Sequence, residues 1–339
     1  MEHPFRLSAL EQSIVREGAD AQQALTCAVQ LAREVEALGY HRLWVSEHHD
    51  APSIAGSSPE VLLAAIGAAT TTIRLGSGGV MLPHYSAYKV AENFATLSNL
   101  YPGRIDLGVG RAPGADMKTA VALATDGRPK FERFPVLVQT LMAAINDPTF
   151  SPRVAPRPVL PLPIWILGTS PDSAMLAAQL GLPYAIALFI NPDFDPGLVQ
   201  LYREQYQPSP QHPEPEVMIS MQVYANESAE HARLMHHAAR ITFIRFVTGR
   251  GVGSISPEDA AHIRLSPEEA AYVSRMGAGA IAGTPDEVAT KVSAAVERYQ
   301  ADEFMAVCNS YHFEDRVQSF ALLSESLQSR APMTRMAAV

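Results

Sequence analysis

The chain has 339 residues and a mass of 36.7 kDa, with 47 % hydrophobic and 18 % charged residues. This mixture supports a large buried core and excludes a disordered chain. Lys and Arg total 26 against 35 Asp and Glu, a formal charge of −9, which disfavours nucleic acid or an anionic lipid surface as a partner. No apolar run approaches the roughly 20 residues of a membrane span, and no secretory signal begins the chain. Two cysteines are too few for a disulfide framework, so we expect a cytoplasmic globular protein.

Short apolar runs alternate with longer amphipathic ones along the chain, which predicts strands alternating with helices. The predicted strands are Phe5–Ala9, Arg42–Val45, Ile73–Met81, Arg104–Val109, Pro163–Leu167, Tyr184–Leu188, Val217–Tyr224 and Glu303–Val307. The predicted helices are Ala21–Leu38, Pro59–Ala69, Ser86–Leu100, Phe131–Ile145, Pro171–Leu180, Gly197–Gln205, Ala229–Val247, Pro285–Tyr299 and Phe313–Leu327.

The alternation fits an α/β fold, as either a doubly wound open sheet or a closed (β/α)8 TIM barrel. A count of eight strands favours the barrel. Such a barrel needs about 250 residues, and three segments rich in proline, glycine or serine account for the surplus. We interpret segments near 148–163, 207–216 and 248–280 as insertions in one barrel domain that spans residues 1–339.

The first candidate site is Glu47-His48-His49-Asp50, which directly follows the predicted strand ending at Val45. In a βα barrel this end of a strand belongs to the catalytic face, and a histidine there suits acid–base chemistry. A metal site is the alternative. Adjacent side chains of an extended segment point in opposite directions, however, so His48 and His49 are poorly placed to bind one ion together. A polar loop that anchors the next helix also remains open.

A second pattern is the glycine cluster Gly76-Ser77-Gly78-Gly79 inside the third predicted strand. Glycine weakens the interior of a strand, so such a cluster indicates a bulge or the close approach of a flat ligand to the backbone. A kink at a corner of the barrel explains the cluster equally well.

Two further patterns suit an anion. Arg111 lies between glycines after the fourth predicted strand, where a guanidinium can bind phosphate or carboxylate, although a surface arginine is the alternative. After the fifth strand, Gly168-Thr169-Ser170-Pro171-Asp172-Ser173 predicts a helix that begins at Ser170. Ser173 stands where a capping box has glutamate, so we expect amide donors to remain for a ligand. The charge of Asp172 opposes an anion unless its side chain turns outward.

Five segments in this order resemble the bacterial-luciferase-like flavin-dependent oxidoreductases, the luciferase-like monooxygenases. They are Leu38–His49, Gly76–Pro83, Tyr101–Arg111, Leu167–Ser170 with Ala177–Pro183, and Gly283–Pro285. The resemblance implies a (β/α)8 barrel that uses FMN, taken up reduced from a separate NAD(P)H:flavin reductase. It also implies a small-molecule substrate, O2 as co-substrate, no metal and a homodimer.

The resemblance also assigns site residues. His48 becomes the catalytic histidine beside the flavin ring. Our own hypothesis adds Glu47 as a second catalytic residue, with Glu47 or Asp50 orienting the imidazole. The implied cofactor-binding residues are Ser77, Gly78, Gly110, Arg111, Gly168, Thr169, Ser170 and Ser173. Within that set, Arg111 and the hydroxyls of the 168–173 turn hold the phosphate, and a cis peptide is expected at Ser77-Gly78 under the ring. Gly110 replaces a cysteine of luciferase itself, which argues against light emission.

The resulting hypothesis is monooxygenation of an unidentified small organic substrate through a flavin C4a-(hydro)peroxide that His48 stabilises or protonates. One alternative is a hydride-transfer enzyme that uses the deazaflavin F420 on the same barrel. A second is a flavin-binding protein without turnover, and a third, less favoured one is a metal-dependent hydrolase.

Overall fold

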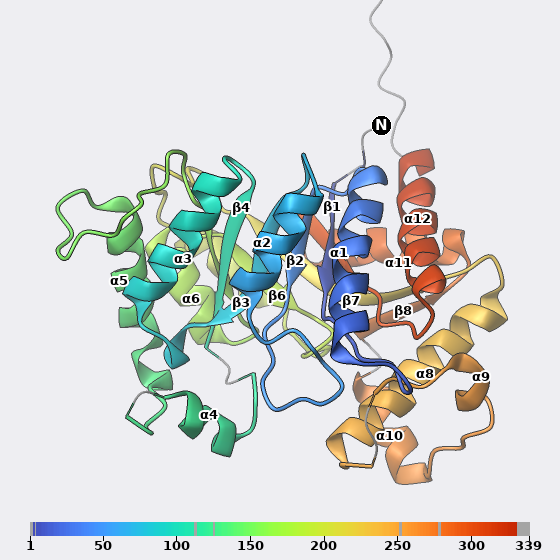
Figure 1. The fold of residues 1–339 in the computed structure, drawn as a ribbon. Helices are drawn as coiled ribbons and strands as arrows, with labels where there is room; N and C mark the ends of the chain where they lie inside the picture. Colours follow the sequence, from blue (N-terminus) through green and yellow to red (C-terminus); the bar gives the residue numbers. More distant parts are fainter. Residues whose placement is uncertain are drawn as a thin grey trace, which may run out of the picture.

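Eight parallel strands close into a barrel (Figure 1). The computed structural model describes residues 3, 5–111, 114–124, 126–250, 253–276 and 279–330. The barrel strands are β1 (Arg6–Glu11), β2 (Arg42–Val45), β3 (Arg74–Met81), β4 (Ile105–Gly110), β5 (Ile164–Leu167), β6 (Tyr184–Ala187), β7 (Val217–Ala225) and β9 (Glu303–Val307). Neighbours in this sequence pair in parallel, and β9 pairs with both β7 and β1. The prediction of a (β/α)8 barrel is therefore confirmed.

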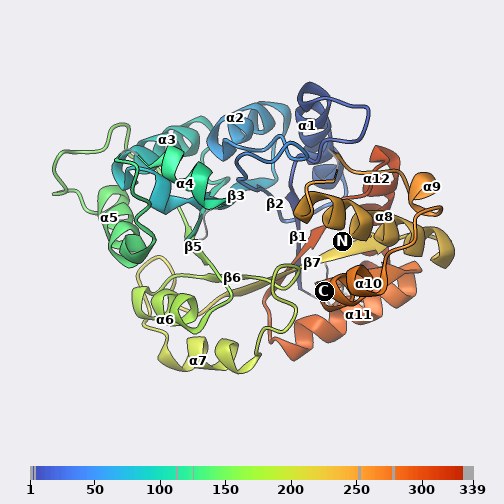
Figure 2. The same cartoon turned by 90° about the horizontal axis from the view of Figure 1, so that it is seen from below.

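Helices surround the barrel, as Figure 2 shows. The main ones are α1 (Ala21–Ala37), α2 (Pro59–Ala69), α3 (Ala87–Leu100), α5 (Phe134–Asn146), α6 (Pro171–Leu180), α7 (Gly197–Gln205), α8 (Ala229–Val247), α11 (Pro285–Arg298) and α12 (Phe313–Arg330). Their apolar faces and the outer faces of the strands form the main hydrophobic core. Across the described part of the chain, no helix is long and apolar enough to cross a membrane.

Several elements differ from the sequence prediction. β1 continues to Glu11, two residues beyond the predicted end, because Leu10 and Glu11 still pair with Trp44 and Val45 of β2. A further strand, β8 (Ala280–Gly283), pairs with the last four residues of β7, of which only Gln222 also pairs with β9. The short helices α4 (Met117–Leu123), α9 (Pro257–Ala260) and α10 (Pro267–Met276) lie in connections. Such short segments carry too few residues for a recognisable hydrophobic period.

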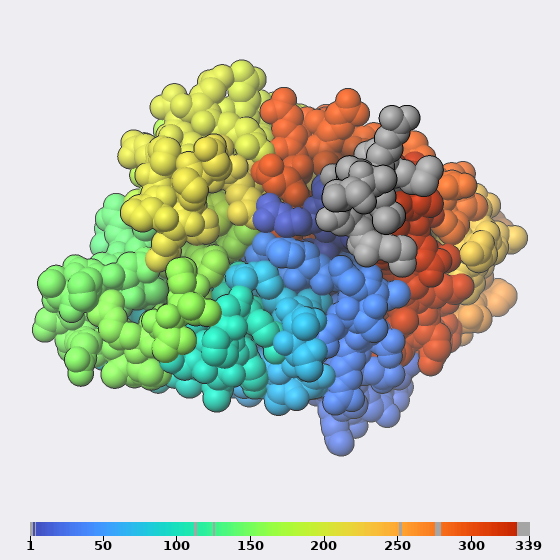
Figure 3. Space-filling model, turned by 90° about the horizontal axis from the view of Figure 1, so that it is seen from above, coloured from blue at the N-terminus to red at the C-terminus, as the bar shows by residue number. Residues whose placement is uncertain are grey.

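The three predicted insertions have different structures. Segments 148–163 and 207–216 contain no helix or strand. Figure 3 shows the green and yellow atoms of these two segments on the same side of one face. Segment 248–280 contains α9, α10 and the start of β8, while its residues 251, 252, 277 and 278 lie outside the described residues.

The barrel interior is layered. At its amino-terminal end Arg42 forms ion pairs with Asp106 and Glu303, all buried. The next layer contains Trp44 and Trp165, whose rings meet edge to face at 5.4 Å. This layer belongs to an apolar cluster inside the barrel: Leu10, Trp44, Trp165, Ala185, Met218, Met305 and Val307. The charged layer and the aromatic layer fill the amino-terminal part of the barrel interior, and a cavity lies above them at the carboxyl ends of the strands.

Gly76 makes room for the aromatic layer, which yields a first prediction. A Cβ atom at Gly76 would overlap the Trp44 indole and lie 2.9 Å from Cβ of Asp106. Gly76→Ala is therefore expected to lower the free energy of unfolding by about 1–3 kcal/mol, the usual cost of overpacking a core. Urea denaturation followed by tryptophan fluorescence measures this change. Gly197→Ala is the control, because its added methyl meets only the exposed side chain of Asp195; equal losses in both variants would contradict the prediction.

Candidate active site

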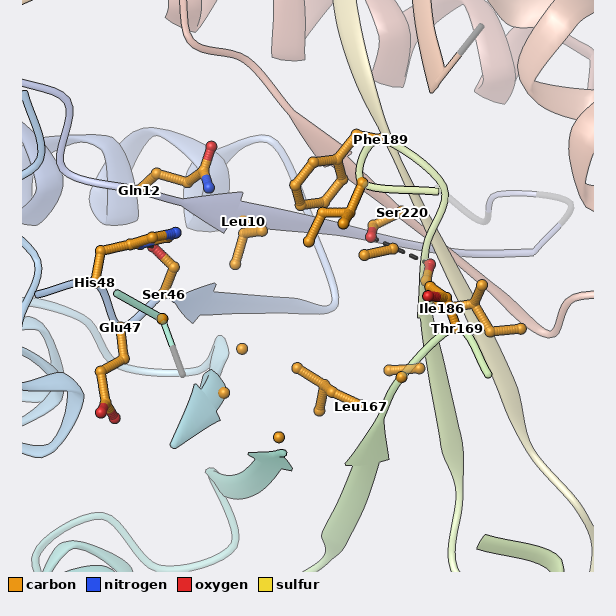
Figure 4. Close-up of a pocket in the computed structure, with 18 of the residues that line it drawn as sticks. Leu10, Gln12, Ser46, Glu47, His48, Leu167, Thr169, Ile186, Phe189 and Ser220 are labelled. Carbon is orange, nitrogen blue, oxygen red and sulfur yellow. Dashed lines mark hydrogen bonds between the residues drawn. The ribbon is translucent and has the colours of Figure 1, made fainter. Parts of the chain in front are cut away.

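A cavity of about 1150 Å³ lies at the carboxyl ends of the barrel strands. It is larger than the roughly 300–1,000 Å³ of common ligand pockets, so it has room for more than one molecule. Leu10, Trp44 and Met305 of the apolar interior contribute to its lining. Figure 4 shows Gln12, Ser46 and His48 on one side and Thr169, Phe189 and Ser220 on the other, with Leu10 and Leu167 between them.

The structure brings nearly all the predicted site residues to this cavity. Those that line it are Glu47, His48, Gly78, Gly110, Arg111, Gly168, Thr169, Ser170 and Ser173. They come from the ends of four successive strands, β2 to β5, and the turns that follow them. Segments separated by more than 100 residues in the sequence therefore meet at one site.

Ser77 is the exception among the predicted site residues. Its side chain is fully buried, and its hydroxyl donates a hydrogen bond to the carbonyl of Gly108 at 2.8 Å. The cis peptide expected at Ser77-Gly78 instead joins Gly78 and Gly79, one residue further on. The register between β3 and β4 also shifts between Ser77 and Val80. Gly78 and Gly79 line the cavity, whereas Ser77 lies in the wall of the barrel.

His48 is held by its own loop. Its backbone N–H donates to the carbonyl of Gly56 at 2.9 Å, and its Nδ1 lies 3.1 Å from the hydroxyl of Ser46. The interpretation that Glu47 or Asp50 orients this imidazole is wrong, because the contact comes from Ser46. Burial lowers the pKa of His48 and outweighs the opposing charge of Glu47. The imidazole is therefore neutral at pH 7, able to accept a proton at one nitrogen while the other carries one.

Glu47 forms hydrogen bonds with groups other than His48. Its buried carboxylate accepts hydrogen bonds from Tyr85 Oη and His49 Nε2, both at 2.8 Å, and from the backbone N–H of Met81 at 3.2 Å. Figure 4 shows this side chain directed away from His48. Asp50 is exposed and accepts from the hydroxyl of Thr119 at 3.3 Å. The carboxylate of Glu47 thus ties the loop after β2 to the end of β3.

His48 and His49 point to separate partners, as expected for neighbours on an extended segment. The first contacts Ser46 and the second contacts Glu47. Among the residues that the structure describes, no three His, Cys, Asp or Glu side chains gather as a metal site.

The opposite end of the cavity carries the predicted anion-binding groups. Ser170 and Ser173 cap the first turn of α6 reciprocally, the Ser170 N–H donating to Ser173 Oγ at 3.1 Å. The expectation that Ser173 leaves these donors unused is wrong, because a serine hydroxyl also completes the capping box. The Arg111 guanidinium and the Thr169 hydroxyl remain at the cavity wall. Arg111 lies 3.8 Å from Asp172, whose side chain is 85 % exposed, so solvent screens this pair strongly.

Other lining residues escaped the sequence prediction. Gln12 and Asn309 follow β1 and β9, and the Asn309 amide donates to Gln12 Oε1 at 2.6 Å. Placing the end of β1 correctly would have found Gln12, since residues just after barrel strands face the site. His236 and Arg240 reach the cavity from α8. Polar residues within a helix carry no sign of the cavity unless the neighbouring elements are known.

Fold and site together define a barrel enzyme whose deep cavity has a glycine wall, a neutral histidine and a cationic end. The chain belongs to the luciferase-like monooxygenase family, whose model matches residues 7–302. A luciferase-like monooxygenase of Escherichia coli strain K12 is 36 % identical over 318 residues, 93 % of this chain and 95 % of that protein. An N-acetyl-S-alkylcysteine monooxygenase of Bacillus subtilis is 38 % identical over 331 residues, 95 % and 98 % of the two chains. The protein is therefore an oxidoreductase of the monooxygenase type.

The solved structures agree with this assignment. The crystal structure of apo-MsnO8 has a TM-score of 0.90 and 35 % sequence identity, covering 96 % of this chain and 98 % of the other. The oxygenating constituent of 3,6-diketocamphane monooxygenase from Pseudomonas putida, a type II Baeyer–Villiger monooxygenase in complex with FMN, has a TM-score of 0.70. At 18 % identity over 96 % of this chain and 98 % of the other, this second likeness shows the common fold alone.

Proposed function

We propose that the protein is an FMN-dependent monooxygenase that acts on a small organic substrate. One observation carries the proposal. A single cavity has the Arg111 guanidinium and the Thr169 hydroxyl at one end and the neutral His48 at the other, and glycines form part of its wall. FMN has the matching parts, a phosphate, a flat ring and a reactive edge. A cavity of about 1150 Å³ leaves space for a substrate beside it.

The residues present fit this cofactor. Arg111 and Thr169 would hold the phosphate through charge-assisted and hydroxyl hydrogen bonds, and Gly78, Gly79 and Gly110 would face the ring. A glycine wall suits a flat ligand because no side chain separates it from the backbone. Reduced FMN, when bound, supplies the electrons that activate O2 for transfer of one oxygen atom to the substrate.

The protein side chains supply binding, orientation and proton control. His48 is neutral and reaches the cavity, so its ring can accept a proton from the substrate or donate a hydrogen bond through the N–H that it carries. Ser46 fixes the plane of that ring, and Glu47 holds the loop without touching the reacting atoms. Leu10, Trp44 and Leu167 keep the floor of the cavity apolar, which excludes water from the reacting centre.

The name of one relative offers a first substrate class. An acylated amino acid with a thioether side chain, as in N-acetyl-S-alkylcysteine, is small, partly apolar and rich in electrons at sulfur. We propose such thioether acids as the first panel to supply with reduced FMN. Oxygen uptake coupled to oxidation of a panel member, with a separate NADH-dependent flavin reductase as the source of reduced FMN, supports the proposal. NADH oxidation by the protein alone contradicts the need for a separate reductase.

A titration of the purified protein tests the cofactor. We expect tighter binding of FMN than of F420, and Arg111→Ala is expected to weaken FMN binding about 10- to 100-fold, the cost of losing a charge-assisted hydrogen bond. Asp172→Asn is the matched variant, expected to strengthen FMN binding by up to about 3-fold, because it removes a solvent-screened competitor for Arg111. Flavin fluorescence measures both changes. Tighter binding of F420, or unchanged FMN affinity in Arg111→Ala, overturns the assignment.

A further inference from the structure

The cavity has a second cationic group far from Arg111. Arg240 lies on α8, and its Nε atom is inaccessible to solvent and has no hydrogen-bond partner. No described residue forms a hydrogen bond or an ion pair with its guanidinium. The side chain is partly exposed and lines the cavity, so a guanidinium without a protein partner is available there to bind an anion through charge-assisted hydrogen bonds.

The neighbours of Arg240 do not neutralise it. His236 lies one turn earlier on the same face of α8 and also lines the cavity. Its ring stacks on Tyr224 with centroids 5.4 Å apart, and burial, with a smaller effect of the Arg240 charge, lowers the pKa of His236 to about 4. His236 is therefore uncharged at pH 7. Three carboxylates line the cavity: Glu47 is held by its own three donors, Asp172 lies beside Arg111, and Glu132 lies in the short 3-10 helix Phe131–Arg133 before α5.

Apolar side chains line the cavity beside Arg240. Ala239 and Phe243 lie beside it on the cavity face of α8, and Phe189 lines the cavity from the loop after β6. Phe243 stacks on Tyr272 of α10 with centroids 6.1 Å apart, which fixes the aromatic wall. A ligand here would pair its charge with the guanidinium and pack an apolar chain against the aromatic rings.

We infer that Arg240 forms the anchoring subsite for the carboxylate of the organic substrate, with the apolar remainder of that substrate against Phe189 and Phe243. The inference rests on the proposed monooxygenase function and names the substrate class, an organic acid with an apolar tail. It also orients the substrate, because an acid anchored on α8 extends its tail toward the floor of the barrel and the flavin wall.

A role for Arg240 in binding the FMN phosphate does not fit the geometry. The predicted phosphate groups follow β4 and β5, whereas α8 follows β7. Figure 2 shows α8 on the side of β1 and β7, and α4 and α6 on the other side of the barrel axis. The cavity thus offers two anion subsites at different sides, one for the cofactor and one for the substrate.

Calorimetric titration with N-acetyl-S-benzylcysteine and its carboxamide tests the inference. These probes differ only in the charge that Arg240 would bind. The titrations use the protein with and without saturating FMN, so the test does not depend on turnover. We expect the acid to bind at least 10-fold more tightly than the amide. Arg240→Gln is expected to remove about 10- to 100-fold of the acid affinity and to leave amide affinity within about 3-fold, while Arg240→Lys retains part of the preference.

The control is Arg233→Gln, an exposed arginine on the same helix, which is expected to change neither affinity. Equal binding of acid and amide, binding of neither, or a preference that survives Arg240→Gln overturns the inference. A fall in FMN affinity in Arg240→Gln as large as in Arg111→Ala assigns Arg240 to the cofactor and also overturns it. Failure of FMN to bind the unaltered protein contradicts the proposed function alone, since the acid preference is also measured without FMN.

Discussion

Replacing Arg42 with methionine is expected to lower the free energy of unfolding by about 3–5 kcal/mol, the cost of leaving buried charges without their partner. The guanidinium bonds Asp106 Oδ2 at 2.7 Å and Glu303 Oε1 at 2.8 Å, and both carboxylates are fully buried. It also lies over the Trp165 ring, 4.9 Å from the ring centroid. The loss would therefore reach from the charged layer into the aromatic floor of the cavity. Chemical denaturation monitored by circular dichroism measures it.

The same variant has a defined pH dependence. Burial alone raises the pKa of Asp106, but Arg42 and Arg74 outweigh it and hold that pKa below its usual value. In the unaltered protein this carboxylate contributes stability above its unfolded pKa, and the contribution is lost as pH falls through the folded pKa. Without Arg42 the folded pKa rises, so the difference between variant and parent should shrink as pH falls toward 4. A difference that stays constant from pH 7 to pH 4 would contradict this account.

A second substitution separates the charge imbalance from the lost packing. In the double variant Arg42→Met with Glu303→Gln, one of the two carboxylates that lose Arg42 is replaced by a neutral amide; Asp106 keeps its ion pair with Arg74. We expect this variant to recover about 1–3 kcal/mol of the stability lost by Arg42→Met alone, because an unsatisfied buried charge costs more than an amide. Arg233→Met is the control for a surface arginine and should be near neutral. No recovery in the double variant would assign the loss to packing around Trp165.

The barrel fold could be predicted from the sequence because its eight strands are buried on both faces. Runs such as Arg42–Val45 and Ile164–Leu167 are apolar enough to stand out between amphipathic helices. The short strand β8 did not stand out, because Ala280–Gly283 contains two alanines and a glycine and extends beyond the closed barrel. Strand ends were also uncertain, which is why Gln12 was missed. Local pattern determines which segments form strands, but pairing with neighbours determines where they end.

The site was predictable where it follows strand ends and unpredictable where it depends on side-chain direction. The rule that barrel sites lie after the strands located Glu47, His48, Arg111 and the turn at Gly168–Ser173. The rule cannot say which hydrogen bonds these side chains form. In the structure His48 contacts the Ser46 hydroxyl, and Glu47 accepts hydrogen bonds from His49 and Tyr85. Arg240 lies within a helix that becomes part of the cavity only through tertiary packing. The hydrogen-bond partners of site residues, and the site residues that lie within helices, could therefore be identified only from the structure.

His48→Ala is expected to lower kcat/KM for substrate oxygenation with supplied reduced FMN by about 10²- to 10⁴-fold, the range of general acid–base catalysis. The imidazole reaches the cavity, is neutral at pH 7 and is fixed by Ser46. FMN affinity should change little, since the predicted phosphate groups lie on the opposite side. Stopped-flow absorbance and product analysis measure the two effects separately. His262→Gln, at an exposed position, is the control and should leave both unchanged.

The pH profile distinguishes the neutral form of His48 from its cation as the active species. Burial holds the pKa of His48 below the usual value near 6.5, so the neutral ring predominates at pH 7 and is lost as pH falls through the lowered pKa. A reaction that needs the neutral ring keeps full kcat/KM above pH 6.5 and declines only in more acidic solution. Ser46→Ala removes the hydroxyl 3.1 Å from Nδ1 and is expected to reduce kcat by about 3- to 10-fold while keeping this acid limb, a loss comparable to one neutral hydrogen bond. Activity that rises on acidification, or an acid limb that persists in His48→Ala, would show that another group carries the proton.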